Sequence, residues 1–191
     1  AETDNTIIQL LPMNATGAHS CPYDSISSFA LEPVYLALEG VGRKTRKKQQ
    51  LLKKLREEFP TGPGSVDYRV KDRKMEVLWE LYREADDVDS GEFADFCRRQ
   101  AYWLDDFALY KVLKYLNAGR PWYEWDEPLR NREAGALKRV LKEHGEAVVF
   151  QQWVQWHLWR QFIGVKQYAG KKGILLKGDI PILVSRDSAD V

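Results

Sequence analysis

Cysteine, methionine and histidine are scarce in this chain of 191 residues, which contains two Cys, two Met and three His. Cys21 and Cys97 stand alone, without the spacing of a metal site, and a disulfide between them is not expected. This usage is typical of a reduced, cytoplasmic protein. The longest apolar runs, around Ile7–Met13 and Ile174–Leu176, are too short to cross a bilayer. The scarcities predict no bound metal and no membrane span.

Neither sign of charge is in excess, because 29 Lys and Arg nearly balance 28 Asp and Glu. A net charge of +1 provides no global field that would select nucleic acid or an anionic membrane. The basic stretch Arg43–Arg56 is a local exception. No aromatic residues interleave with its charges, so a solvated helix face is favoured over a nucleic-acid site.

Aromatic residues are plentiful, with seven Trp, seven Phe and nine Tyr, and they indicate a packed core rather than a disordered chain. Ala1–Asn5 is polar and acidic and has no signal-peptide character. The absence of an initiator Met indicates a cut or processed chain, and the length fits one domain or a piece of a larger one.

Two apolar segments are predicted to be strands buried on both faces, as in a parallel sheet: Thr6–Met13 and Ile174–Val184. Phe29–Glu39 is either extended or a short helix. Apolar spacing predicts helices between the two strands, with Ser90 as an N-cap and a bend at Gly145. The predicted helices are Arg43–Phe59, Val70–Ala85, Glu92–Leu116, Leu129–His144 and Glu146–Ala169. The inward stripe predicted for Glu92–Leu116 is Phe93, Phe96, Gln100, Trp103, Phe107, Tyr110 and Leu113.

The segment between the strands is far longer than the roughly 10–12 residues that a βαβ crossover requires. Two strands cannot form a sheet domain with a closed core. The pattern therefore predicts an α/β fold, helix-dominated by residue count, that is a slice of a larger domain. Its parts are a strand and loop (1–38), a helical insertion (39–146), and a helix and strand that end in a loop (147–191).

Polar side chains follow both predicted strands. Asn14–Ser28, here called the Tyr23 loop, follows the first strand, and Gly178–Val191, here called the closing segment, ends the second. In α/β barrels the carboxyl ends of the strands carry the site, so the two loops predict a site for a polar small molecule. Tyr23 offers a ring face and a hydroxyl. Asp179 either faces that site or accepts loop N–H groups.

Other candidates have ordinary structural alternatives. The aromatic helix around Trp153 and His157 is interpreted as core rather than as a sugar platform. The loop Trp122–Asp126 is either a stacking surface or packing for the insertion. Cys21 lacks an orienting third residue, so a nucleophilic role is disfavoured, and His19 has no partners at metal-ligand spacing.

Six stretches in order resemble one known family, the 4-α-glucanotransferases or amylomaltases of glycoside hydrolase family 77. The resemblance implies a partial (β/α)8 TIM barrel in which the two parallel strands are similar to barrel strands two and three. The stretches are Gln9–Asn14, Ser20–Ala30, Val66–Tyr68, Trp103–Leu109, Pro121–Trp122 and Gly178–Val191.

The family transfers α-1,4-glucan segments between maltooligosaccharides by a retaining double displacement, without a cofactor. That reaction needs two carboxyl groups about 5–5.5 Å apart. In the family they lie in later Arg-x-Asp-His and Glu-Asp motifs, and neither motif occurs in this sequence. The resemblance thus implies no catalytic residue here, with the pair expected beyond Val191 and the isolated chain inactive. The alternative is a non-catalytic glucan-binding or interaction module.

The resemblance also implies which residues bind substrate. Cys21 stands where many relatives have Ser, and Tyr68 matches a tyrosine of a secondary glucan site whose partner tyrosine is replaced here by Ala18. The substrate-binding residues implied are Tyr23, Cys21, Asp179, Asp187 and Ser188.

Overall fold

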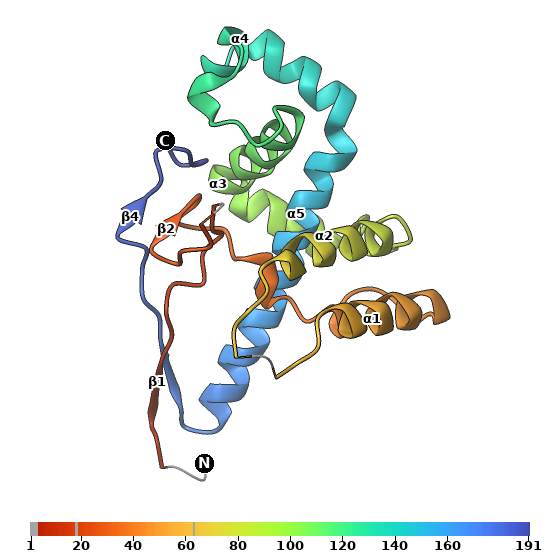
Figure 1. Cartoon of the computed structure of the whole chain (residues 1–191), viewed down its shortest axis with the longest axis vertical. Helices are drawn as coiled ribbons and strands as arrows, with labels where there is room; N and C mark the ends of the chain where they lie inside the picture. The colour runs from red at the N-terminus through yellow and green to blue at the C-terminus, as the bar shows by residue number, and fades with distance from the viewer. Residues whose placement is uncertain (1–3, 18, 63) are drawn as a thin grey trace.

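The computed structural model describes residues 4–17, 19–62 and 64–191 as a helix-rich fold with two short pairs of parallel strands. Figure 1 shows the helices gathered on one side and the strands along the other. The elements are β1 (Ile7–Gln9), β2 (Asp24–Ser25), η1 (Pro33–Tyr35), η2 (Leu38–Gly40), α1 (Arg46–Glu58), α2 (Arg69–Tyr82), α3 (Gly91–Leu116), η3 (Trp122–Glu124), α4 (Glu127–Arg130), α5 (Ala134–Lys171), β3 (Leu175–Lys177) and β4 (Leu183–Val184).

The three predicted helices α1, α2 and α3 are confirmed to within a few residues at each end. Ser90 is the N-cap of α3, as predicted, and its hydroxyl accepts a hydrogen bond from the N–H of Phe93 at 3.2 Å. The segment Phe29–Glu39 forms the 3-10 turn η1 and the start of η2.

The two helices predicted around Gly145 form one long helix, α5. It bends at His144, whose φ of −126° and ψ of 21° are not helical, one residue before the predicted position. The predicted start at Leu129 was wrong, because Leu129 belongs to the short helix α4. Arg132 has a φ of 56°, and a right-handed helix cannot pass through that backbone conformation.

The core lies where α3 packs along α5 (Figure 1). The aromatic helix predicted to be core is core: Trp153, Trp156 and His157 are buried, and the Trp153 indole donates to Asp87 at 2.7 Å. The predicted inward stripe of α3 is confirmed by the burial of its phenylalanines and of Tyr110. No helix in the described ranges is long and apolar enough to cross a membrane.

The strand predictions were wrong in burial and in extent. The segment Ile174–Val184 contains two strands with different partners: β3 pairs with β1, and β4 pairs with β2. Pro181 lies between them and has no N–H to give to a ladder. Ile7 of β1 is 56% exposed and Leu175 of β3 is 66% exposed, because each ladder has only two strands.

Two glutamines of α5 act as substitutes for strand partners. The Gln155 side chain accepts from the N–H of Leu31 at 2.8 Å and donates to its carbonyl at 2.9 Å. Gln161 makes the same pair of bonds to Ala37, both at 2.9 Å. The amide group thereby satisfies both backbone groups of one extended residue.

Lysines of α1 and α2 bind the 3-10 turns η1 and η2 of the same stretch. The Lys48 ammonium of α1 is buried and donates to the carbonyls of Glu39 at 2.8 Å and Val41 at 2.6 Å. Burial lowers its pKa, so these carbonyl oxygens are what makes the buried charge tolerable. Lys74 of α2 donates likewise to the carbonyl of Val34.

Replacing Gln155 by leucine leaves the buried backbone groups of Leu31 without partners. We expect Gln155→Leu to lower the free energy of unfolding by about 2–4 kcal/mol, measured by urea denaturation. Gln152→Leu is the matched control. Within the described ranges Gln152, on the same helix, binds the exposed Asp105 alone, so its replacement should lower the free energy of unfolding by less than about 0.5 kcal/mol. Equal losses for the two variants would contradict this role of Gln155.

Candidate functional site

Strand pairing brings two of the predicted site residues together. Tyr23 directly precedes β2 and Asp179 lies between β3 and β4, and the N–H of Leu183 donates to the Tyr23 carbonyl at 3.2 Å. The Tyr23 hydroxyl donates to Oδ2 of Asp179 at 3.0 Å, although the two residues are 156 positions apart. Oδ1 of Asp179 accepts from the N–H of Ile180 at 2.9 Å. Asp179 therefore accepts a loop N–H, as one alternative predicted, and with its other oxygen it contacts Tyr23.

This pair is suited to polar recognition. The hydrogen bond to Asp179 raises the pKa of Tyr23, and partial burial and the aspartate charge act in the same direction. The phenol therefore stays protonated at neutral pH. A half-buried ring with a hydroxyl, next to a carboxylate with spare lone pairs, offers an apolar face, a donor and acceptors at one place.

Glu32, which no sequence pattern singled out, fixes the Tyr23 loop through bonds to Thr16. Its carboxylate is 4% exposed, and Oε2 accepts from the N–H of Thr16 at 2.8 Å and from its hydroxyl at 2.9 Å. Lys71 of α2 pairs with the same oxygen at 2.8 Å and donates to the Thr16 carbonyl at 3.1 Å. A buried carboxylate is stable only with such partners, so the loop is tied to α2.

Asp187 of the closing segment is engaged by the helical insertion. Oδ2 pairs with the Lys114 ammonium at 2.6 Å, and Oδ1 accepts from the N–H of Trp122 at 3.1 Å. The Tyr110 hydroxyl lies 3.1 Å from Oδ1 and 2.8 Å from the Asp187 carbonyl. Burial and the nearby aspartate raise the pKa of Tyr110, so this phenol remains a donor.

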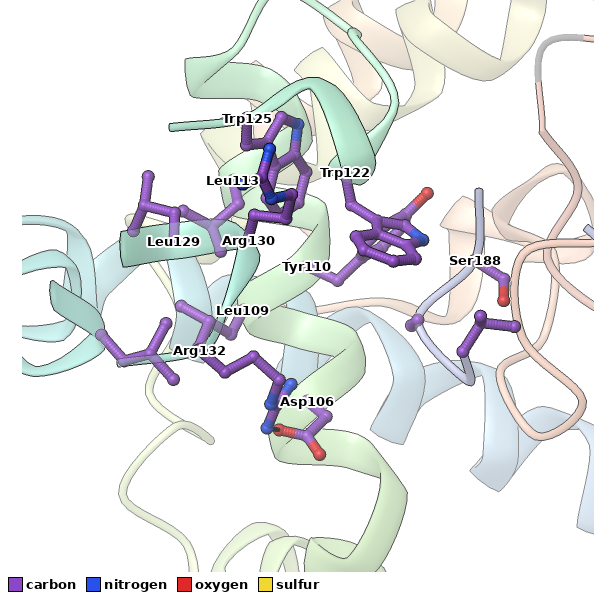
Figure 2. Close-up of a pocket in the computed structure, with 13 residues that line it drawn as sticks. Asp106, Leu109, Tyr110, Leu113, Trp122, Trp125, Leu129, Arg130, Arg132 and Ser188 are labelled. Atoms are coloured by element: carbon purple, nitrogen blue, oxygen red, sulfur yellow. Dashed lines mark hydrogen bonds and ion pairs between the residues drawn. The ribbon is translucent and has the colours of Figure 1, made fainter. Parts of the chain in front are cut away.

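A cavity of about 160 Å³ lies beside this contact and is walled by Tyr110, Trp122 and Trp125. Figure 2 shows Arg132 and Asp106 facing each other at its edge, and their ion pair measures 2.6 Å. Ser188 lines the cavity, is 1% exposed, and finds no hydrogen-bond partner for its hydroxyl in the described part of the chain. Such a volume is well below that of ordinary ligand pockets.

The remaining candidates lie at the surface. Cys21 is exposed and is a free thiol, and its carbonyl accepts from the N–H of Asp24 in the turn that carries Tyr23. Tyr68 is exposed at the start of α2, whereas Ala18, at its expected partner position, lies outside the described residues. Over the described ranges, no group of three or more His, Cys, Asp or Glu could hold a metal ion.

Comparison with known families places this arrangement. A family model described as 4-alpha-glucanotransferase, of glycoside hydrolase family 77, matches residues 1–191. The chain belongs to the 4-alpha-glucanotransferase family. The expectation from the six resembling stretches is thereby confirmed at the level of the family.

Individual relatives of this 4-alpha-glucanotransferase family member agree. The 4-alpha-glucanotransferase of Thermus thermophilus is 37% identical over 189 residues, which are 96% of this chain and 36% of that protein. The Chlamydia pneumoniae relative is 34% identical over 191 residues, again 36% of its length. The chain thus spans little more than a third of the curated relatives that it matches.

A solved structure agrees in fold. The amylomaltase from Streptococcus agalactiae in complex with acarbose matches 99% of this chain and 38% of its own chain, with a TM-score of 0.77 and 23% identity. The helix-rich arrangement with two parallel strand pairs is therefore that of an amylomaltase.

Sequence reasoning about this 4-alpha-glucanotransferase family member missed Lys114, and it assigned Tyr110 only to the core. The two residues lie four apart on α3, on one face of the helix, and both bind Asp187. A tyrosine and a lysine at that spacing on an otherwise apolar stripe were the available signal.

Removing the Asp179 charge should change the titration of Tyr23. We expect Asp179→Asn to lower the pKa of Tyr23 toward its ordinary value, because the variant removes the negative charge that disfavours the phenolate. The measurement is a pH titration of the Tyr23 ring carbon by NMR, with the signal assigned from Tyr23→Phe. Asp190→Asn is the matched control, because Asp190 binds the N–H of Ser28 instead. An unshifted Tyr23 in Asp179→Asn would contradict the pairing.

Proposed function

We propose that this chain is the part of a 4-alpha-glucanotransferase that holds an α-1,4-glucan beside the catalytic centre, with Tyr23 and Asp179 as the sugar contacts. The observation that carries the proposal is the 3.0 Å hydrogen bond between these residues, which come from two separate loops of the chain. Family membership supports the choice of a glucan as the ligand.

The chemistry of the pair supports binding. Sugars present hydroxyl groups around an apolar ring, and Tyr23 with Asp179 supplies an aromatic face, a hydroxyl and a carboxylate. The pair is oriented before a ligand arrives, because Asp179 is also bonded to the N–H of Ile180. Less freedom is then lost on binding.

A binding role rather than a catalytic one fits the residues present. The retaining double displacement proposed for the whole enzyme needs a nucleophile and an acid/base about 5–5.5 Å apart. The family motifs that supply them, Arg-x-Asp-His and Glu-Asp, do not occur in this sequence. We therefore assign catalysis to the part of the enzyme that corresponds to the remaining length of the relatives.

The strands fit a partial (β/α)8 barrel. Both ladders are parallel, and Ile180, Ile182 and Leu183 expose apolar side chains that further barrel strands would cover. The inserted helices then form a subdomain between the second and third barrel strands. The free thiols of Cys21 and Cys97 support a cytoplasmic location.

Secondary contacts follow the same reasoning. Cys21 is exposed in the same turn as Tyr23, so it can face the same sugar, and the exposed ring of Tyr68 offers a second stacking position. Ser188 is buried, which makes it a weaker candidate than the other residues of the loops.

Binding can be measured on the chain itself. We expect maltoheptaose to change the tryptophan fluorescence saturably, and Tyr23→Phe to weaken binding roughly three- to tenfold, as expected for one hydrogen bond. Tyr35→Phe is the matched control, because Tyr35 is a half-exposed tyrosine in the separate turn η1.

Maltotriose should give neither glucose nor longer chains with the pure chain. Turnover would refute the assignment of catalysis to another part of the enzyme. Absence of saturable binding, or equal effects of the Tyr23 and Tyr35 variants, would refute the sugar contacts.

A further inference from the structure

We propose that Asp187 is a positioning residue. Together with Lys114 and Tyr110 of α3, it fixes the closing segment and thereby sets the geometry of the Tyr23–Asp179 pair, without itself contacting sugar. The inference rests on the proposed function for its consequence in glucan binding, whereas its effect on Tyr23 can be measured without any sugar.

The first step is that the Asp187 carboxylate is already occupied. Both oxygens accept from the insertion: Oδ2 from Lys114 at 2.6 Å, and Oδ1 from the N–H of Trp122 at 3.1 Å. The side chains of Asp187 and Lys114 are only a quarter or less exposed, so solvent screens this pair less than an ordinary surface ion pair. The Tyr110 hydroxyl also lies 3.1 Å from Oδ1, so three protein donors surround this carboxylate and compete with a sugar hydroxyl for its oxygens.

The second step is that the partners of Asp187 are themselves held. Lys114 also donates to the carbonyls of Gly119 at 2.6 Å and Arg120 at 3.1 Å, just beyond the end of α3. The neighbouring residue Arg186 is also bound to the insertion, because its carbonyl accepts a hydrogen bond from the Trp122 indole at 2.7 Å. The closing segment is therefore bound at two successive residues to α3 and η3 of the insertion.

The contacts of Asp187 and Arg186 are connected to the Tyr23–Asp179 pair through the β4–β2 ladder. The N–H of Ser185 donates to the Ser25 carbonyl at 3.0 Å, and that of Ala189 donates to the Ile26 carbonyl at 2.9 Å. Asp187 lies between these two bonds, and the β4–β2 ladder that they extend begins next to Tyr23. Release of Asp187 would loosen this ladder and with it the approach of Tyr23 to Asp179.

The variants Asp187→Asn and Lys114→Met remove the two halves of the ion pair, and Tyr110→Phe is a milder change should either variant unfold. Lys142→Met is the matched control, because Lys142 is an exposed lysine of the long helix α5 and no bond to Asp187 joins it within the described ranges. Each variant is made in the full chain with ring-labelled tyrosine. Circular dichroism checks that it is folded.

The main readout is the Tyr23 titration by NMR without sugar. We expect Asp187→Asn and Lys114→Met to shift the Tyr23 pKa in the same direction as Asp179→Asn does, and the double variant to add little to either. Lys142→Met should leave the Tyr23 titration unchanged. In the same samples, maltoheptaose affinity should fall roughly tenfold for Asp187→Asn and for Lys114→Met. A Tyr23–Asp179 pair that is no longer held in one orientation weakens binding as the loss of a contact does.

Two results would overturn the proposal. One is an unchanged Tyr23 titration in folded Asp187→Asn, Lys114→Met and Tyr110→Phe. The other is weaker maltoheptaose binding in Asp187→Asn alone, which would make Asp187 a direct sugar contact. If the unmodified chain binds no maltoheptaose, the proposed function fails, and the Tyr23 titration still decides whether Asp187 positions the pair.

Discussion

Buried backbone N–H and C=O groups must find partners, and in this chain the strands are too short to supply them. The ladders contain three and two residues per strand. Side chains from elsewhere take over: Glu32 binds the N–H of Thr16, Gln155 binds both groups of Leu31, and Asp187 binds the N–H of Trp122. The extended segments are consequently held by side-chain contacts with the helices, and the rest of the fold depends on these contacts.

This constraint gives the helical insertion a role in the site. Parallel pairing of β2 with β4 brings Tyr23 near Asp179, but a two-residue ladder is weak by itself. Glu32 and Lys71 fix the Tyr23 loop to α2, and Asp187 and Lys114 fix the closing segment to α3. Both fixings use charged groups at low exposure, where a lost partner is costly. The helices therefore act as the frame that holds the two loops carrying Tyr23 and Asp179.

The sequence predicted what depends on local pattern and failed where distant partners decide. The spacing of apolar residues located α3, and Ser90 identified its cap, because both signals lie within one helix. The burial of Ile7 was predicted wrongly, since an apolar run shows what a strand could bury and not whether a second layer covers it. Tyr23 and Asp179 were candidates because each lies in a polar loop beside a predicted strand, and the family resemblance implied that they bind substrate. The partners of Asp187 lie 65 to 77 residues away, so the spacing of Tyr110 and Lys114 on α3 marks a polar position but does not identify Asp187 as its partner.

The occupied carboxylates separate two kinds of acidic residue in this part of the enzyme. A retaining nucleophile needs an oxygen free to attack the sugar, with a second carboxyl group about 5–5.5 Å away. Asp187 does not have such a free oxygen, because its charge is paired with Lys114 and both the N–H of Trp122 and the Tyr110 hydroxyl lie within hydrogen-bond distance of its other oxygen. Asp179 accepts one hydrogen bond on each oxygen, from the Tyr23 hydroxyl and from the N–H of Ile180. It retains lone pairs that a sugar hydroxyl can use. In the proposed function, binding and positioning thus reside in this chain while the reacting groups come from the rest of the enzyme, and the frame must then hold the glucan in one orientation.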